Sequence, residues 1–302
     1  MMKKRLWSRW ILALAVVWPC MAAAHDRVRE KENFDFDWKF ILNADDRANA
    51  GMQVSEAGWQ DVQLPHDWSI SQNFDPKLSG SNGHLPGGIG WYRKTFRVDK
   101  KDKGRRIAVL FDGIYSRSDV YVNGQHLGFR PYGFCYQEYD LTPYLNYGAE
   151  NVLAVRVNNP LEHDSVARWY TGAGIYRHTW LVKTAEVHVA SYGTYVTTPV
   201  VTAERAEVRV RTSVANEAKR TKTLSVRQQI TDGEGRTVVQ SGKQTLQVAA
   251  GQTADTEHTL EIPRPQLWDT EHPYLYTLHT AVYDGRKLVD TYETVFGVRT
   301  CE

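Results

Sequence analysis

Two acidic residues, Glu138 and Asp140, have a spacing that could support acid–base chemistry. Residues two positions apart in a strand point to the same face, so the two carboxyl groups would lie side by side, as a general acid and base must. Asp140 stands directly before Leu-Thr-Pro at 141–143, where an aspartate is typical of the residue that caps a helical turn. We therefore interpret the pair as structural.

No other pattern in the sequence predicts catalysis or metal binding. The G-x-S-x-G, H-E-x-x-H and G-K-S/T motifs of hydrolases, zinc enzymes and phosphate-binding loops are missing. Cys135 and Cys301 have no partners at zinc-ligand spacing, and they could pair or remain free thiols. The glycine-rich segment 80–90 could cradle an anion, but it lacks a lysine and a following helix, which favours a loop. We expect no metal and no cofactor.

Residues 1–24 have the composition of a secretory signal peptide. Lysine or arginine occupies positions 3, 4, 5 and 9, an apolar run covers 11–17, and alanines at 22–24 suit a cleavage site. The apolar run is too short to span a bilayer. We expect cleavage of this leader and export to the periplasm or the medium, with no membrane span afterwards. Loss of its four cations changes the net charge from +2 to −2, which gives no reason to expect nucleic acid as a partner.

The next segment, 25–185, has the alternation and turn signals of β-strands rather than of helices. Its strands are rich in aromatic and β-branched residues and are expected at 34–40, 91–98, 106–111, 151–157 and 178–182. The clearest hairpin joins 119–122 to 125–129 through Asn123 and Gly124, which tolerate the positive φ angles of a tight turn. These irregularly spaced strands favour a jelly-roll sandwich.

In residues 186–302 the strands are shorter and more regularly spaced. We expect them at 187–195, 206–213, 223–231, 237–240, 244–248, 256–262, 275–283 and 287–298. About eight strands in a segment of this length are typical of an immunoglobulin-like β-sandwich. The predicted fold class is therefore all-β, a jelly-roll β-sandwich followed by an immunoglobulin-like β-sandwich, with a boundary near Ala185.

Several stretches follow one another in a characteristic order. They are LPHDW at 64–68, GGIGWYRKTF at 87–96, FDG at 111–113, VYVNG at 120–124, RWYTGAGIYR at 168–177, LW at 267–268, HPYLY at 272–276 and FGVR at 296–299. In wording, order and spacing they resemble glycoside hydrolase family 2, and its β-galactosidase branch in particular. The resemblance covers nearly the whole chain after the leader and implies a sugar-binding-type jelly roll followed by an immunoglobulin-like domain.

In that family a (β/α)₈ barrel comes next and carries two glutamates, one the acid/base and one the nucleophile of a retaining mechanism. A barrel needs about 250 residues, and only three residues follow Arg299. The resemblance thus implies the N-terminal part of an exported β-galactosidase-like hydrolase that is inactive alone, because both catalytic glutamates are missing. Its expected partners are a carbohydrate with a terminal β-linked sugar and a catalytic barrel, which a separate chain could supply. The alternative is an exported, non-catalytic two-sandwich module that binds carbohydrate or protein.

Jelly-roll loops of this family reach over the barrel to the sugar, which implies substrate-binding roles for Asp67, Arg168, Trp169 and Tyr170. Asp67 could accept a hydrogen bond from a sugar hydroxyl or cap a turn, and we favour the turn. Arg168 stands where better-known relatives have an acidic residue; it could donate a bidentate pair to hydroxyls or bridge to an acidic loop. Trp169 and Tyr170 could stack on a sugar face, although burial in the sandwich is the commoner arrangement.

Overall fold

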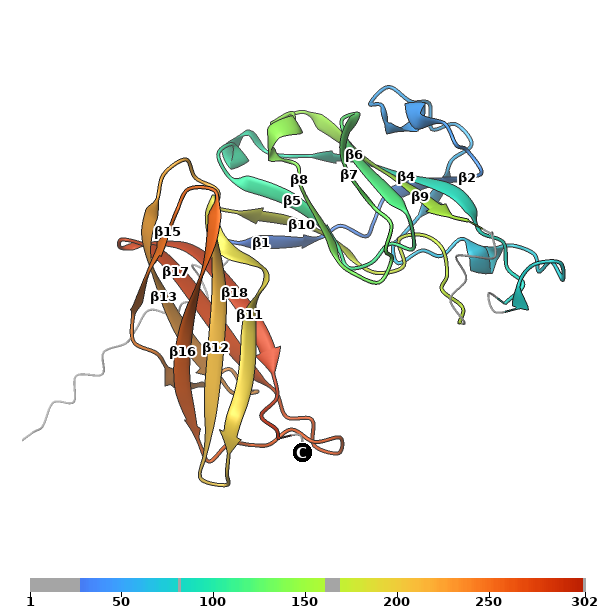
Figure 1. Cartoon of the computed structure of the whole chain (residues 1–302). Coiled ribbons are helices and arrows are strands. Elements are labelled where there is room, and N and C mark those ends of the chain that lie inside the picture. The colour runs from blue at the N-terminus through green and yellow to red at the C-terminus, as the bar shows by residue number, and fades with distance from the viewer. Residues whose placement is uncertain (1–27, 81–82, 161–168, 301–302) are drawn as a thin grey trace, which may run out of the picture.

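The computed structural model describes residues 28–80, 83–160 and 169–300. Within these ranges the regular elements are β-strands and short turns of 3₁₀ helix, and the strands form two successive sandwiches (Figure 1). The predicted fold class, all-β with two β-sandwiches, is confirmed. The predicted leader at 1–24 lies outside the described residues.

The first sandwich contains one four-stranded and one six-stranded antiparallel sheet, with strand orders β1-β10-β5-β8 and β3-β2-β4-β9-β6-β7. Its strands are β1 (Glu30–Asn33), β2 (Trp38–Leu42), β3 (Gln60–Val62), β4 (Gly88–Arg97), β5 (Arg106–Phe111), β6 (Ser118–Val122), β7 (Gln125–Arg130), β8 (Gln137–Asp140), β9 (Glu150–Asn159) and β10 (Thr179–Thr184).

The second sandwich packs a sheet of order β11-β12-β16 against a sheet of order β14-β13-β17-β18, in which β15 also pairs with β13. Its strands are β11 (Val187–Val201), β12 (Arg205–Asn216), β13 (Lys222–Thr231), β14 (Thr237–Gln240), β15 (Gln244–Val248), β16 (Gln252–Pro263), β17 (Tyr276–Asp284) and β18 (Lys287–Phe296). Every strand expected in this part of the sequence is present.

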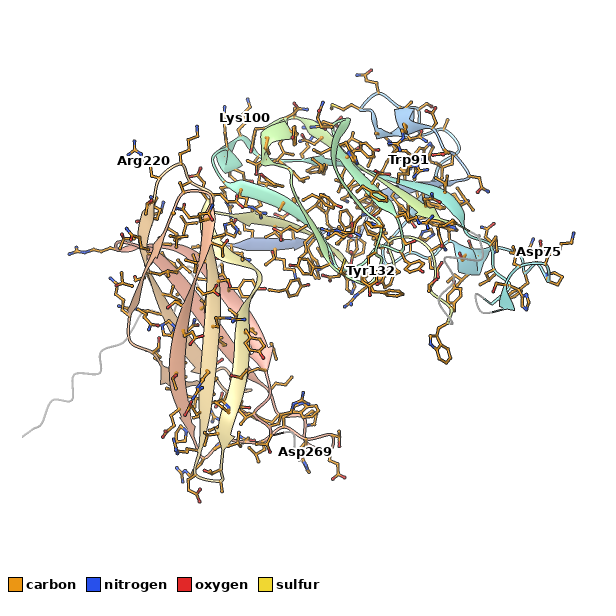
Figure 2. All side chains as sticks on the ribbon, in the orientation of Figure 1. Asp75, Trp91, Lys100, Tyr132, Arg220 and Asp269 are labelled. Atoms are coloured by element: carbon orange, nitrogen blue, oxygen red, sulfur yellow. The ribbon has the colours of Figure 1, made fainter. Side chains whose placement is uncertain are left out.

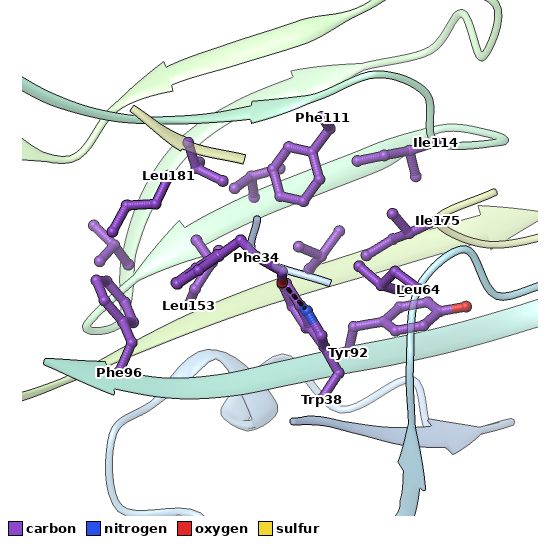
Figure 3. Packing of buried hydrophobic residues seen from close by; sticks show 14 of the residues in the cluster. Phe34, Trp38, Leu64, Tyr92, Phe96, Phe111, Ile114, Leu153, Ile175 and Leu181 are labelled. Carbon is purple, nitrogen blue, oxygen red and sulfur yellow. Dashed lines mark hydrogen bonds between the residues drawn. The ribbon is translucent and has the colours of Figure 1, made fainter. Parts of the chain in front are cut away.

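Large rings fill the core of the first sandwich (Figure 3). Trp38 is fully buried, and its indole N–H donates to the Phe34 carbonyl at 2.7 Å, which satisfies the one polar atom of the ring. Tyr92 is also fully buried and meets Trp38 edge-on, with ring centroids 6.4 Å apart. These rings set the distance between the two sheets of the first sandwich, below the loops that connect its strands.

Strand β4 is buried on both of its faces. Trp91, Tyr92 and Arg93 follow one another, and none is more than 1 % exposed. The segment before β3 covers the outer face, where the Arg93 guanidinium donates to the carbonyls of Asn49 and Gly51 and pairs with Glu56 at 3.0 Å. The cover explains why burial does not alternate along this strand.

The strand predicted over 34–40 is wrong in its first half, because the chain turns between β1 and β2. Asp35 is buried there and its carboxylate accepts from the Thr179 backbone N–H and binds the His178 ring, both at 2.7 Å. Asp37 has a φ of 57°, which a strand does not allow. A buried carboxylate that links β1 to β10 thus overrides the alternating pattern.

The hairpin prediction is confirmed, because Asn123 and Gly124 have φ angles of 50° and 83° and connect β6 to β7 in a tight turn. The predicted cap at Asp140 is one residue early: Leu141 is the N-cap of the 3₁₀ turn at Thr142–Tyr144. The Asp140 carboxylate accepts from the Thr142 backbone N–H at 2.9 Å, just before that turn. Glu138 pairs with Arg106 at 2.7 Å, so both acidic residues have structural partners.

The two sandwiches meet at an angle (Figure 1), and ion pairs cross the junction. Arg106 of β5 pairs with Glu217 at 2.8 Å. Arg29, directly before β1, donates through two nitrogens to Asp290 of β18, which is fully buried. The N-terminal segment is therefore bound to the second sandwich as well as to the first.

No helix among the described residues is long and apolar enough to cross a membrane.

Candidate functional site

The loop that carries Asp67 lies against the loop that precedes β10. The backbone N–H groups of His66 and Trp68 donate to the carbonyls of Ile175 and Ala173, at 2.8 and 3.1 Å. The Trp68 ring is fully buried and stacks on Phe40, with centroids 5.5 Å apart. One core side chain therefore anchors the loop directly beside Asp67.

Asp67 connects the two loops through its carboxylate. Oδ1 accepts from the backbone N–H groups of Ser69 and Ala173, both at 2.9 Å, and Oδ2 accepts from the Tyr170 hydroxyl at 2.6 Å. A carboxylate has about four acceptor positions, so one remains available on Oδ2. Asp67 thus has the structural role that we favoured, and it can still accept one hydrogen bond from a ligand hydroxyl.

Two glycines permit this close approach of the loops. A Cβ on Gly172 would lie 2.6 Å from Asp67 Oδ2, and one on Gly174 would lie 2.3 Å from the Tyr92 hydroxyl. Both glycines have positive φ angles, 70° and 123°. The Gly-Ala-Gly sequence is therefore a steric requirement of the Asp67 site.

Tyr170 and Trp169 are exposed, contrary to our preference for burial. The side chain of Trp169 is 72 % exposed and that of Tyr170 is 42 % exposed. Partial burial and the hydrogen bond to the Asp67 carboxylate raise the pKa of Tyr170, so its hydroxyl stays protonated and keeps donating at neutral pH. The structure brings Asp67 and Tyr170 into contact, and Trp169, the residue before Tyr170, is largely exposed. Arg168, the fourth predicted site residue, lies outside the described residues.

Sequence reasoning missed the residues that support these loops. Asn159, at the end of β9, donates through its side-chain amide to the Gly172 carbonyl at 3.1 Å. His66, to which we gave no role, lies 2.8 Å from the Tyr92 hydroxyl through Nδ1, and burial lowers the pKa of its ring. The only sequence signals for them are that His66 directly precedes Asp67 in the LPHDW motif and that Asn159 stands at the end of a strand.

The exposed groups at these two loops include the carboxylate of Asp67, which has one unused acceptor position, and the aromatic side chains of Trp169 and Tyr170. Among residues 28–80, 83–160 and 169–300, no group of three or more histidine, cysteine or acidic side chains could hold a metal ion. Cys135 is a free thiol, and Cys301 lies outside the described ranges.

Two family models match the chain over nearly all of its described length. Residues 32–185 match the glycosyl hydrolases family 2 sugar binding domain, and residues 187–299 match the model of glycosyl hydrolases family 2. These models adjoin between β10 and β11, where the first pair of sheets ends and the second begins.

Similar proteins are considerably longer than this chain. A beta-galactosidase of Bacteroides ovatus, BoGH2A, is 42 % identical over 289 residues, which are 93 % of this chain and 33 % of that protein. A beta-glucuronidase of Formosa agariphila is 34 % identical over 90 % of this chain and 30 % of its own length. The crystal structure of a family 2 member from Bacteroides cellulosilyticus superposes with a TM-score of 0.81 at 37 % identity, over 89 % of this chain and 35 % of the other. The chain thus spans about a third of the relatives that it matches, and by both family models it belongs to glycoside hydrolase family 2.

Proposed function

We propose that this chain is the N-terminal, non-catalytic part of an exported β-galactosidase-like glycosidase. In this proposal the two sandwiches form a platform, and the residues that cleave the glycosidic bond belong to a further domain. The 42 % identity to a beta-galactosidase supports this branch of the family. The substrate class is a carbohydrate with a terminal β-linked sugar.

The observation that carries the proposal is the Asp67 site. A carboxylate with one unused acceptor position accepts a hydrogen bond from an exposed tyrosine, and the residue before that tyrosine is an exposed tryptophan. Carboxylates accept hydrogen bonds from sugar hydroxyls, and aromatic rings pack against the C–H face of a sugar. We infer that Asp67 receives a hydroxyl of the terminal sugar, while Trp169 contacts one of its faces.

A second feature supports a role as a platform. Tyr132, Phe134 and Tyr136 are between 45 and 60 % exposed, and the Tyr136 ring packs on Tyr192 of the second sandwich with centroids 4.7 Å apart. Figure 2 shows Tyr132 on the side of the first sandwich that faces the second. Exposed aromatic clusters of this kind mark interaction surfaces. In the proposal this aromatic face, Tyr132–Phe134–Tyr136, packs against the catalytic domain.

A chimera tests the proposal. This chain would replace the matching N-terminal third of the B. ovatus beta-galactosidase, and turnover of an aryl β-galactoside would be measured for the chimera and for this chain alone. We expect turnover by the chimera and none by the chain. In a second chimera, Phe134→Asp places a charge on the aromatic face. Each domain of this variant should still fold, but the sandwiches should no longer pack against the catalytic domain, and turnover should be lost. A well-folded, assembled chimera without turnover would contradict the proposal.

The 72 % exposure of Trp169 also fits a binding module without catalysis. Under that reading the chain alone would be retained on a galactoside affinity column, and Trp169→Ala would weaken the retention. Under the proposal, retention by the chain alone is negligible, because the rest of the sugar site belongs to the catalytic domain.

Export is tested separately. The predicted leader should be removed in a bacterial host, so the protein recovered from the periplasm or medium should begin at His25. Recovery of uncleaved protein from the cell interior would contradict this part of the proposal.

A further inference from the structure

A cleft of about 330 Å³ lies at the junction of the two sandwiches. Lys31 of β1 and residues of β5 and β10 form one wall, and Tyr192 of β11 with Tyr292 and Glu293 of β18 form the other. Clefts of this size at domain junctions are common places for small ligands. The cleft has no residue in common with the aromatic face Tyr132–Phe134–Tyr136 or with the Asp67 site.

Two cations line this junction cleft with unused hydrogen-bonding capacity. The Lys31 ammonium lies 4.0 Å above the Trp180 ring, and it makes no ion pair with any residue that the structure describes. Arg29 uses Nε and Nη2 on Asp290 and the Val189 carbonyl, which leaves Nη1 without an acceptor in the described part of the chain. An anion in the cleft could therefore take one donor from each residue.

The charges nearby favour such an anion. Burial and the positive charge of Arg29 lower the pKa of Lys31, while Asp112 opposes the shift. Glu293, the carboxylate that lines the cleft, is already paired with the His279 ring at 3.1 Å. Asp290 already compensates the charge of Arg29, so Lys31 is the cation of the cleft without an ion pair among the described residues. A bound oxyanion would pair with Lys31 and could accept a further hydrogen bond from Arg29 Nη1.

The tyrosines that line the cleft are held in place by hydrogen bonds. The Tyr192 hydroxyl donates to Asp112 at 3.1 Å, and the Tyr192 backbone N–H donates to the Tyr292 hydroxyl at 3.0 Å. Tyr192 is nevertheless 56 % exposed, so part of its ring is open to a ligand. Rings fixed before binding lose little conformational entropy when a ligand arrives.

We propose that the junction cleft binds one anionic sugar residue, a sugar that carries a carboxylate or sulfate group. Lys31 and Arg29 bind the oxyanion, Glu293 accepts from sugar hydroxyls, and the exposed part of the Tyr192 ring packs against the sugar. This inference goes beyond the proposed function and does not depend on it.

Titration of the full chain with three probes tests the inference. Glucuronate, galactose 6-sulfate and neutral galactose would be compared by calorimetry or by NMR shifts at low ionic strength. We expect at least one of the two anionic sugars to bind about tenfold or more tightly than galactose, which is the effect of one charge-assisted hydrogen bond. The comparison of glucuronate with galactose 6-sulfate shows which oxyanion is preferred.

Three variants locate the binding. Lys31→Met removes the charge and keeps the apolar stem, and it should weaken the anionic sugar about tenfold. Lys31→Arg should restore binding. Lys243→Met is the matched control, because Lys243 is exposed between β14 and β15, at the opposite edge of the sheet from β18, and it should change nothing. Thermal unfolding of each variant confirms that it is folded.

Several results would overturn the inference. They are equal affinity for galactose and both anionic sugars, undetectable binding of both anionic sugars at millimolar concentration, and full anionic-sugar affinity in folded Lys31→Met. None of these results would affect the chimera test, because that test measures turnover and not binding by this chain.

Discussion

The two sandwiches of this chain build their cores differently. In the first, a single cluster rich in large rings, with Trp38, Trp68 and Tyr92 fully buried, runs between the sheets. In the second, two mostly aliphatic clusters occupy the two ends of the sandwich, one around Val210 and Leu278 and the other around Val214 and Val282. The second core is therefore interrupted along its length.

A buried polar layer causes this interruption. On β12, β13 and β17 the inward position between the two clusters is taken by Thr212, Gln228 and Thr280. The Gln228 side chain donates to the Thr212 hydroxyl at 2.9 Å and accepts from the Thr280 hydroxyl at 2.7 Å. Gln228 and Thr280 are cross-strand partners, so a slip of one residue between β13 and β17 would leave both groups unpaired. The bond to Thr212 of the facing sheet fixes how the two sheets lie on each other.

The comparison relates each core to the role of its domain. The first core places its rings directly beneath the loop of Asp67, which in the proposed function must hold a binding group in one position. The second core carries no loop of the Asp67 site, and its polar layer specifies strand pairing. We expect the stability of the first sandwich to depend most on its buried aromatic side chains. The stability of the second should depend most on the hydrogen bonds of its polar layer.

The largest effect is expected for Trp68→Ala. Removal of a fully buried tryptophan leaves a cavity beneath the Asp67 loop and should lower the free energy of unfolding by about 4 kcal/mol. Urea unfolding measures this change. Trp169→Ala, at an exposed tryptophan of the same site, is the control and should stay within about 0.5 kcal/mol of wild type. Equal effects of the two substitutions would contradict the description of the first core.

Much of the fold could be predicted from the sequence, because its signals are local. The Asn123-Gly124 turn and the strands of the second sandwich depend on residues close to one another, and their predictions are confirmed. The strand over 34–40 failed because Asp35 bonds to His178 and Thr179, which are far away in the sequence.

The candidate site was only partly predictable for the same reason. The motifs around 64–68 and 168–177 directed attention to Asp67 and Tyr170, but their contact depends on backbone pairing between two distant loops. The exposure of Trp169 depends on how the loop leaves the sheet, and no local pattern specifies that. The polar layer could not be predicted either, because threonine is common in strands both where it faces the core and where it faces the solvent.

The next largest effect concerns the junction, where Arg29→Met would leave Asp290 without its counter-ion. Breaking one side of a buried ion pair should lower the free energy of unfolding by about 3 kcal/mol. Arg97→Met is the matched control, because the Arg97–Glu150 pair is on the surface and should contribute almost nothing. Chemical unfolding of both variants measures the difference. A neutral result for Arg29→Met would mean that the sandwiches are stable independently of this pair.

A smaller effect is expected for Gln228→Leu, which leaves the Thr212 and Thr280 hydroxyls buried without their partner. We expect a loss of about 2 kcal/mol. The triple variant with Thr212→Val and Thr280→Val removes all the polar groups and should recover most of that stability. Urea unfolding of both proteins compares them, and a triple variant that is less stable than Gln228→Leu would contradict this reading of the layer.

The smallest effect is a pH dependence at the junction. Burial, followed by the charges of Arg106 and Arg29, lowers the pKa of His188 to about 3. The folded protein then keeps this ring neutral, whereas in the unfolded chain the ring is protonated as the pH falls below about 6.5. The stability that the neutral ring contributes is therefore complete above pH 6.5 and is lost as the pH falls toward 3. Between pH 6.5 and 5.5, wild type should lose about 1 kcal/mol more stability than His188→Gln. If the free energies of unfolding of wild type and His188→Gln changed equally with pH, the lowered pKa of His188 would be contradicted.

The most direct measurement is the kcat/KM of the chimera carrying Asp67→Asn, together with its thermal unfolding. The asparagine oxygen can still accept from the Ser69 and Ala173 backbone N–H groups, so the loops should remain together and the unfolding temperature should hardly change. If Asp67 binds the sugar, kcat/KM should fall about tenfold, as expected for the loss of one charge-assisted hydrogen bond. An unchanged kcat/KM in a variant of unchanged stability would show that Asp67 only joins the two loops, and that this chain does not contribute to the sugar site through it.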